Sequence, residues 1–174
     1  MEIRGSCFCK AVSYAFTGPP VLSAYCHCTL CQRLTGCPFV HTIHTAPGSF
    51  RWTHTAGAGS SSAMGEDDSE GHNEEDALIS RSLHTYTLPS KPHKTRYRCK
   101  VCGVCVAGYH SIRGRWSVWG AHLVMKEGVR EMVQPTGHIF YGTRMVDVRD
   151  GLGKWEGYEG ESERILEGGG GEGT

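Results

Sequence analysis

The sequence lacks long hydrophobic runs. Its 174 residues contain no stretch of about 18 consecutive apolar residues, so no membrane-spanning helix is expected. The N-terminus also lacks an apolar stretch that could serve as a secretory signal, which favours a cytoplasmic protein. Thiols stay reduced in that compartment, and nine cysteines are an odd number for a disulfide framework. The cysteines are therefore expected to bind metal.

No long segment has helical periodicity either. Short runs rich in Val, Thr, Tyr and Phe are separated by turn signals about every ten residues, which is typical of a sandwich or barrel. The expected strands are 11–16, 39–44, 84–88, 95–98, 104–110, 116–119 and 138–141. Only 30–35 and 124–132 have the character of short helical turns. The sequence predicts a mainly β fold with few helical turns.

The net charge is zero, but the acidic residues are concentrated in two segments. Residues 55–76 hold seven of them with no Lys or Arg, and residues 156–174 hold six with one Arg. Both segments are rich in Gly and poor in large apolar residues. We therefore expect one domain over 1–158 with a disordered acidic insertion at about 55–76, followed by a disordered tail over 159–174. Such segments either aid solubility or cover a basic site, since the remaining chain has 17 Lys and Arg against 5 Asp and Glu.

Two pairs of cysteines have the spacing of a closed zinc site. Residues two apart on an extended strand share a face, so Cys7 and Cys9 can aim both sulfurs at one ion. Cys99 and Cys102 have the spacing of a zinc knuckle, followed by Gly103 where the turn needs an unusual backbone angle. Two ligands from each pair predict a tetrahedral structural zinc that joins distant parts of the chain and contributes to folding.

A middle group places three potential ligands within six residues. Cys26 and Cys28 are expected on one strand face, and Cys31 is expected to return from the following turn. The group has no obvious fourth protein ligand, and an open position is what a catalytic zinc site needs. Three thiolates and Zn²⁺ together carry about −1, which suits a soft guest such as a thiolate. The middle group therefore predicts a catalytic zinc.

Residues near the middle group leave an alternative open. A second structural site would result if His27, Cys37 or Cys105 completed the coordination. Because His27 alternates with the ligand cysteines, its side chain is expected to point away from the zinc. Arg33 follows two residues after Cys31, where its fixed charge could pair with a substrate carboxylate or simply meet solvent.

The cysteine groups lie in motifs that resemble one known family. Residues 5–14 (GSCFCKAVSY) and 25–39 (YCHCTLCQRLTGCPF) resemble the opening and core motifs of the glutathione-dependent formaldehyde-activating enzymes, a family that includes centromere protein V. Three later segments are similar to further motifs of the family: 98–103 (RCKVCG), 135–139 (PTGHI) and 151–158 (GLGKWEGY). The resemblance covers nearly all of 4–158 in order.

The resemblance implies an Mss4-like, zinc-bound β-sandwich with two Zn²⁺ per chain. By motif position, the structural zinc would be held by Cys7, Cys9, Cys99 and Cys102. The catalytic zinc would be held by Cys26, Cys28 and Cys31. Two departures from the motifs lie next to ligands, since Lys10 replaces the usual Gly and Gln32 replaces a common Arg. Neither is itself a ligand.

The expected function is that of a zinc-dependent carbon–sulfur lyase or synthase acting on a glutathione-type thiol adduct, such as S-hydroxymethylglutathione. The thiolate would occupy the open position of the three-cysteine zinc, beside Arg33. One alternative is a zinc hydrolase, isomerase or lyase of a small specialised metabolite without glutathione.

The other alternative is a non-catalytic, zinc-stabilised module that binds nucleic acid or an acidic partner. The sequence contains no RNP-like motif and no basic stripe interleaved with aromatics, so nucleic acid is not the expected partner. No membrane association is expected, and a homodimer is compatible with the sequence.

Overall fold

The computed structural model describes residues 1–55, 79 and 81–166. The expected acidic insertion lies outside the described residues apart from Thr55, and so does the expected tail from residue 167 onward. Within the range expected for one domain, the chain forms two compact units. They consist of Met1–Leu22 with Ile43–Val133, and of Ser23–Thr42 with Gln134–Thr174.

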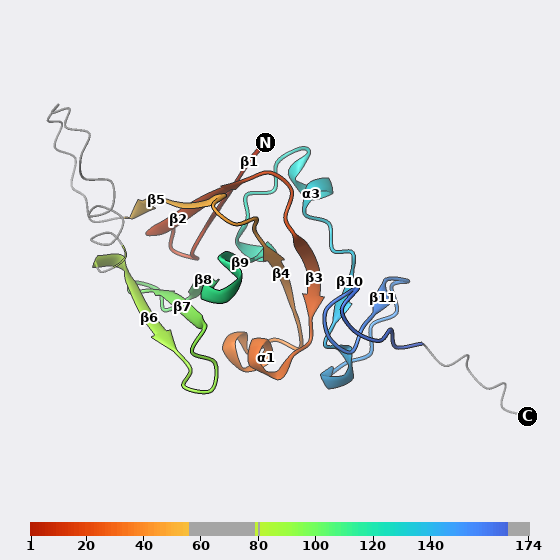
Figure 1. The fold of residues 1–174 in the computed structure, drawn as a ribbon. Coiled ribbons are helices and arrows are strands. Elements are labelled where there is room, and N and C mark those ends of the chain that lie inside the picture. The colour runs from red at the N-terminus through yellow and green to blue at the C-terminus, as the bar shows by residue number, and fades with distance from the viewer. Residues whose placement is uncertain (56–78, 80, 167–174) are drawn as a thin grey trace, which may run out of the picture. The chain divides into compact units, whose positions relative to one another are not determined.

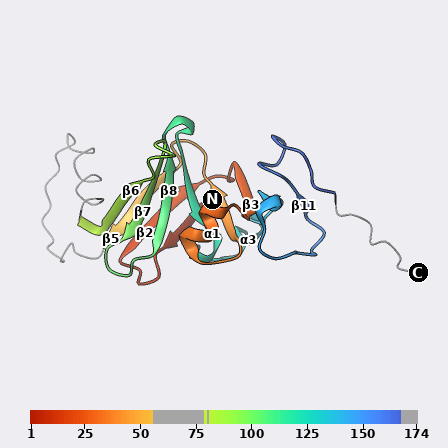
Figure 2. The same cartoon turned by 90° about the horizontal axis from the view of Figure 1, so that it is seen from below.

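The first unit contains two antiparallel sheets (Figure 1). One has the order β1-β2-β5 and consists of β1 (Glu2–Ser6), β2 (Val12–Thr17) and β5 (Phe50–Thr55). The other has the order β9-β8-β7-β6 and consists of β6 (Leu83–Thr87), β7 (Lys94–Cys99), β8 (Cys105–His110) and β9 (Arg115–Trp119). Figure 2 shows β6, β7 and β8 side by side. The strands of this unit that the sequence analysis missed are β1 and β5.

Aromatic side chains join the two sheets of this unit. Phe50 stacks on Trp116 with ring centroids 4.3 Å apart, and Trp52 contacts Tyr97 at 5.8 Å. The fully buried ring of Tyr14 stacks on Phe50 at 5.4 Å. Such rings bury large apolar areas and favour offset or edge-to-face contacts. The unit is a β-sandwich, and the mainly β prediction is confirmed.

The second unit is built on parallel strand pairs. Its β10 (Gly137–Ile139) pairs in parallel with β3 (Leu22–Cys26) and with β11 (Gly153–Lys154). Next to β3 in the sheet order lies β4 (Val40–His44), and α1 (Thr29–Thr35) connects the two. The strands β3 and β11 were not predicted, because β11 has only two residues and the buried positions of β3 do not alternate.

The remaining helices are short. The expected turn at 30–35 is covered by α1, which begins one residue earlier, and α3 (Val129–Met132) occupies the end of the expected turn at 124–132. The described residues also include three single-turn 3₁₀-helices: η1 (Ser111–Arg113), η2 (Gly120–His122) and η3 (Tyr141–Thr143). None of the helices in the described part of the chain is long and apolar enough to cross a membrane. Of the expected tail, residues 159–166 are described, and Ile165 donates its backbone N–H to the carbonyl of Lys154 at 2.8 Å.

The turn between β1 and β2 holds a lysine in the left-handed region of backbone space. Lys10 has a φ of 62°, and its N–H donates to the carbonyl of Cys7 at 3.0 Å. This region costs a residue with a Cβ about 1–2 kcal/mol, whereas glycine adopts it freely. The glycine usual at this position of the resembled motif fits the observed geometry, and the lysine here is strained.

We expect Lys10→Gly to raise the free energy of unfolding by about 0.5–1 kcal/mol, because removing the Cβ relieves the strain of the turn. Urea denaturation of the metal-loaded protein measures the change. Lys10→Ala is the matched control, because it removes the charge but keeps the Cβ, and it is expected to give no gain. Equal gains in the two variants would show that charge rather than backbone strain is responsible.

Candidate metal centres

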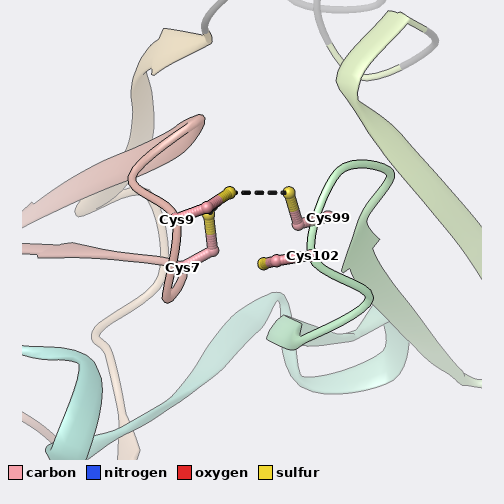
Figure 3. A group of neighbouring side chains, drawn as sticks. All are labelled: Cys7, Cys9, Cys99 and Cys102. Carbon is pink, nitrogen blue, oxygen red and sulfur yellow. Dashed lines mark hydrogen bonds between the residues drawn. The ribbon is translucent and has the colours of Figure 1, made fainter.

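Four cysteine sulfurs of the first unit converge, as Figure 3 shows. Cys7 and Cys9 lie on the turn after β1, whereas Cys99 ends β7 and Cys102 lies on the turn that follows it. The Sγ atoms of Cys7 and Cys9 are 3.6 Å apart, and those of Cys9 and Cys99 are 3.8 Å apart. All four sulfurs lie within 4.8 Å of one another. The structure therefore brings together the four residues predicted for one site.

The spacing of these sulfurs suits a tetrahedral metal ion. With metal–sulfur bonds of about 2.3 Å, as for zinc, tetrahedral thiolates lie about 3.8 Å apart. Burial raises the pKa of Cys7 to about 12, so this thiol stays protonated in the absence of a cation. A donor set of four thiolates selects zinc or iron–sulfur centres. The cluster can hold a metal ion, and zinc remains the predicted one.

Backbone groups orient the sulfurs of this cluster. The N–H of Val12 donates to the Sγ of Cys7 at 3.4 Å, and the N–H of Gly103 donates to the carbonyl of Cys99 at 2.9 Å. Gly103 has a φ of 73°, which confirms the unusual backbone angle expected there. The extended strand expected for Cys7 and Cys9 is wrong, because β1 ends at Ser6 and the chain turns to return as β2. The turn, not a strand face, points both sulfurs to one side.

Three sulfurs of the second unit form another cluster. The Sγ atoms of Cys26, Cys28 and Cys31 lie within 4.8 Å of one another. Cys26 ends β3, Cys28 is the N-cap of α1 and Cys31 lies in its first turn. The N–H of Cys31 donates to the Sγ of Cys28 at 3.4 Å. The shared strand face expected for Cys26 and Cys28 is wrong, because the chain leaves β3 and the Cys28 sulfur caps the helix.

The charges of this cluster depend on one another. Hydrogen bonds from the thiols of Cys26 and Cys31 lower the pKa of Cys28, and the same close contacts, with burial, raise the pKa of Cys26. All three groups can therefore be thiolates only if a cation offsets their repulsion. In the described part of the chain, neither His27 nor the remaining cysteines Cys37 and Cys105 joins the three. This set can hold a metal with one position left for another ligand.

Arg33 is exposed on α1. Residues two apart on an α-helix do not face each other, so Arg33 and Cys31 occupy different helix faces. The role predicted for Arg33, which is to pair with a substrate carboxylate, stays a prediction.

Sequence reasoning missed several residues that surround His27. The buried ring of His27 contacts His138, whose other nitrogen contacts Asp150. Burial lowers the pKa of His27 to about 4, and His138 adds to the effect, so His27 is neutral at pH 7. Gln32, one of the departures from the resembled motif, donates to the carbonyl of His27 at 2.8 Å. No spacing signal links these residues, because His138 follows His27 by 111 positions.

Comparison with known proteins agrees with the motifs. Residues 2–81 match the family model described as glutathione-dependent formaldehyde-activating enzyme, which confirms the predicted resemblance over that range. The comparison with curated proteins found no match. A crystal structure of a Rhodobacter sphaeroides protein, a structural genomics target, is 17% identical in sequence and superimposes with a TM-score of 0.44. The alignment covers 76% of this chain and 96% of that one.

We expect the wild-type protein to bind two zinc ions per chain. Cys28→Ser is expected to lose only the zinc ion of the second unit while the protein stays folded. Cys99→Ser is expected to lose the other ion and to lower the melting temperature, because that ion joins two turns distant in sequence. Elemental analysis after gel filtration and thermal denaturation provide the measurements. Cys37→Ser is the matched control, because this exposed cysteine lies outside both clusters and its replacement should leave both ions bound. A single ion in the wild-type protein would contradict the two-site assignment.

Proposed function

We propose that this chain, which carries a glutathione-dependent formaldehyde-activating domain over residues 2–81, is a cytoplasmic zinc-dependent carbon–sulfur lyase or synthase. Its substrate would be an adduct of a glutathione-type thiol. The observation that carries the proposal is the set of three sulfurs from Cys26, Cys28 and Cys31, which no fourth donor joins in the described part of the chain. A zinc ion in this set would supply an electrophilic centre that stabilises a substrate thiolate.

Differences in burial indicate the side from which a substrate approaches. Cys26 is buried, whereas Cys28 and Cys31 are partly exposed at the start of α1. The open side of the cluster therefore lies toward the helix. Arg33, exposed on the same helix, would pair its permanent charge with a carboxylate of the thiol substrate as it approaches.

The proposed reaction needs no oxidant or reductant. In the lyase direction, the bond between the hydroxymethyl carbon and the sulfur breaks, and its electron pair stays on the sulfur. The hydroxyl proton leaves as the carbonyl forms, so an S-hydroxymethyl adduct gives formaldehyde and a free thiol. The synthase direction is the reverse, with the thiolate as nucleophile.

Cys28→Ala is expected to lose turnover to the level of the uncatalysed reaction while it keeps the fold and the metal of the first unit. Nuclear magnetic resonance with ¹³C-formaldehyde and glutathione follows the interconversion in both directions. Cys37→Ala should retain wild-type turnover. Turnover by Cys28→Ala at the wild-type rate would overturn the proposal.

Two comparisons refine the experiment. Arg33→Ala is expected to raise the KM for glutathione by up to about fivefold, the value of one exposed charge pair, with no such rise for 2-mercaptoethanol, which lacks a carboxylate. Activity on small metabolites without any added thiol would favour the hydrolase or isomerase alternative instead.

A second candidate function rests on a basic sheet face in the first unit. Residues directly opposite each other on paired strands share a face. On this face Lys94, His110 and Arg115 lie side by side across β7, β8 and β9. Arg96 lies opposite the exposed Tyr86 of β6. The sequences of these four strands contain no Asp or Glu. The sequence did not predict a basic stripe with an exposed aromatic, because strand pairing is what brings Tyr86 and His110 beside the cations of β7.

This face suits single-stranded nucleic acid. The guanidinium of Arg98 lies 5.8 Å from the ring centroid of Tyr86. Alternate residues along β7 place Lys94, Arg96 and Arg98 at intervals of about 6.6 Å, so several cations can contact successive phosphates. An exposed tyrosine beside them can stack on a base. Binding at this face would be independent of the three-cysteine centre.

Fluorescence anisotropy with a labelled single-stranded oligonucleotide tests the second candidate. The logarithm of the affinity should fall linearly with the logarithm of salt concentration, by about 0.7 per phosphate contacted. Arg96→Ala with Arg98→Ala should weaken binding and flatten this slope, whereas Arg130→Ala, an exposed arginine on α3, should not. No binding by the wild-type chain, or equal competition by polyglutamate, would exclude nucleic acid as the partner.

A further inference from the structure

A chain of hydrogen bonds starts at the residue between Cys26 and Cys28 and leads to a partly exposed carboxylate. The Nε2 of His27 lies 2.8 Å from the Nδ1 of His138, and the Nε2 of His138 lies 2.9 Å from the Oδ2 of Asp150. Both imidazole side chains are fully buried, whereas that of Asp150 is 31% exposed. Buried polar atoms need partners. Both nitrogens of His138 and the Nε2 of His27 have them in this chain of groups, whereas the buried Nδ1 of His27 has no partner among the described residues.

Asp150 sets the direction of these hydrogen bonds. Although burial opposes it, hydrogen bonds from His138 and from the N–H of Leu152 lower the pKa of Asp150, so the group is a carboxylate. A carboxylate only accepts, which assigns the Nε2 proton of His138 to this bond. In the neutral imidazole of His138, Nδ1 is then an acceptor, and this assignment makes the Nε2–H of His27 the donor to it. One carboxylate therefore selects the tautomers of both rings.

Hydrogen bonds also hold the backbone of His27, and two of them come from residues that lie close to His138 in the sequence. Its N–H donates to the carbonyl of Ile139 at 3.0 Å. Its carbonyl accepts from Gln32 Nε2 at 2.8 Å and from Thr143 Oγ1 at 3.0 Å. The ring of Phe39 packs on the imidazole, with centroids 4.9 Å apart. The backbone of His27 and its side chain are thus both held in place.

The neighbours of His27 in the chain are two of the three sulfur donors, so a shift of the His27 backbone displaces both. Groups that support metal ligands from outside the coordination sphere commonly change metal affinity by about 10–100-fold. We propose that His138, with its tautomer selected by Asp150, is a positioning residue that holds His27 and thereby sets the Cys26 and Cys28 sulfurs for metal binding. This inference rests on the metal centre of the proposed function.

Two replacements of His138 distinguish positioning from packing. The amide of asparagine takes the place of Nδ1, whereas that of glutamine takes the place of Nε2. His138→Asn therefore keeps an acceptor for the hydrogen bond from His27. His138→Gln keeps the contact with Asp150 but loses the hydrogen bond from His27. We expect the affinity of the second-unit centre for Zn²⁺ to fall about 10–100-fold in His138→Gln and less than about threefold in His138→Asn.

Asp150→Asn tests the tautomer directly. The new amide has two possible orientations. In one it donates to His138, which reverses both hydrogen bonds of the chain. In the other its NH₂ group faces the N–H of Leu152, so that two donors face each other. A loss of about tenfold in zinc affinity is expected in the presence of His138, and no further loss in the His138→Asn background. Such non-additivity distinguishes action through His138 from an independent effect of the lost charge.

Competition between the full-length protein and a chromophoric zinc chelator provides the measurement, and Cys28→Ser identifies which dissociation step belongs to the second unit. Wild-type protein with one zinc would contradict the proposed function itself. Two zinc ions with equal affinities in wild type, His138→Gln and Asp150→Asn would overturn only the positioning role. Loss of the first-unit zinc together with the second in His138→Gln would also overturn it, because general unfolding would then explain the result.

Discussion

Repulsion between crowded thiolates is the physical constraint on which both candidate centres depend. Unit charges about 4 Å apart interact by about 4 kcal/mol at the effective dielectric of a protein surface. Four sulfurs within 4.8 Å of one another therefore cannot all be ionised without a cation, and neither can the three of the second unit. A bound dication offsets these repulsions, because it attracts every thiolate in the set. The turn after β1 and the turn after β7 are then joined by a bond stronger than any single hydrogen bond between them.

Much of this arrangement could be predicted from the sequence because metal ligands are chemically unambiguous. The spacing of the cysteines alone divides them into sets of four and three, and the structure assembles the same sets. Their local backbone could not be predicted, because a CxC pair suits a tight turn as well as a strand. At Cys28 a helix begins where a strand was expected, since a sulfur can cap a helix much as an oxygen does. Strand length did not decide which strands could be predicted, because the three-residue β10 was expected whereas β1 and β5, of five and six residues, were missed. Both missed strands are defined by their pairing with β2, which no local pattern reports.

The residues around the three-cysteine cluster could not be predicted for a different reason. Hydrogen bonds to His27 come from Gln32 and from residues more than a hundred positions later, and no linear pattern reports such pairs. The basic face of the β6–β9 sheet has the same origin, because register places cations from separate strands side by side. Both features depend on contacts between residues that are distant in the sequence. A single sequence therefore shows the residues but not that they lie side by side.

The order in which these groups are synthesised has a consequence for the living cell. Cys26, Cys28 and Cys31 leave the ribosome before His138 and Thr143, which hold His27 and follow it by more than a hundred residues. At elongation rates of about 5–20 residues per second, the nascent chain presents its thiols for roughly 5–20 s before that support exists. During this interval the sulfurs are open to oxidation and to any soft metal. A reducing environment during synthesis would therefore protect these sulfurs until the residues that support them have been made.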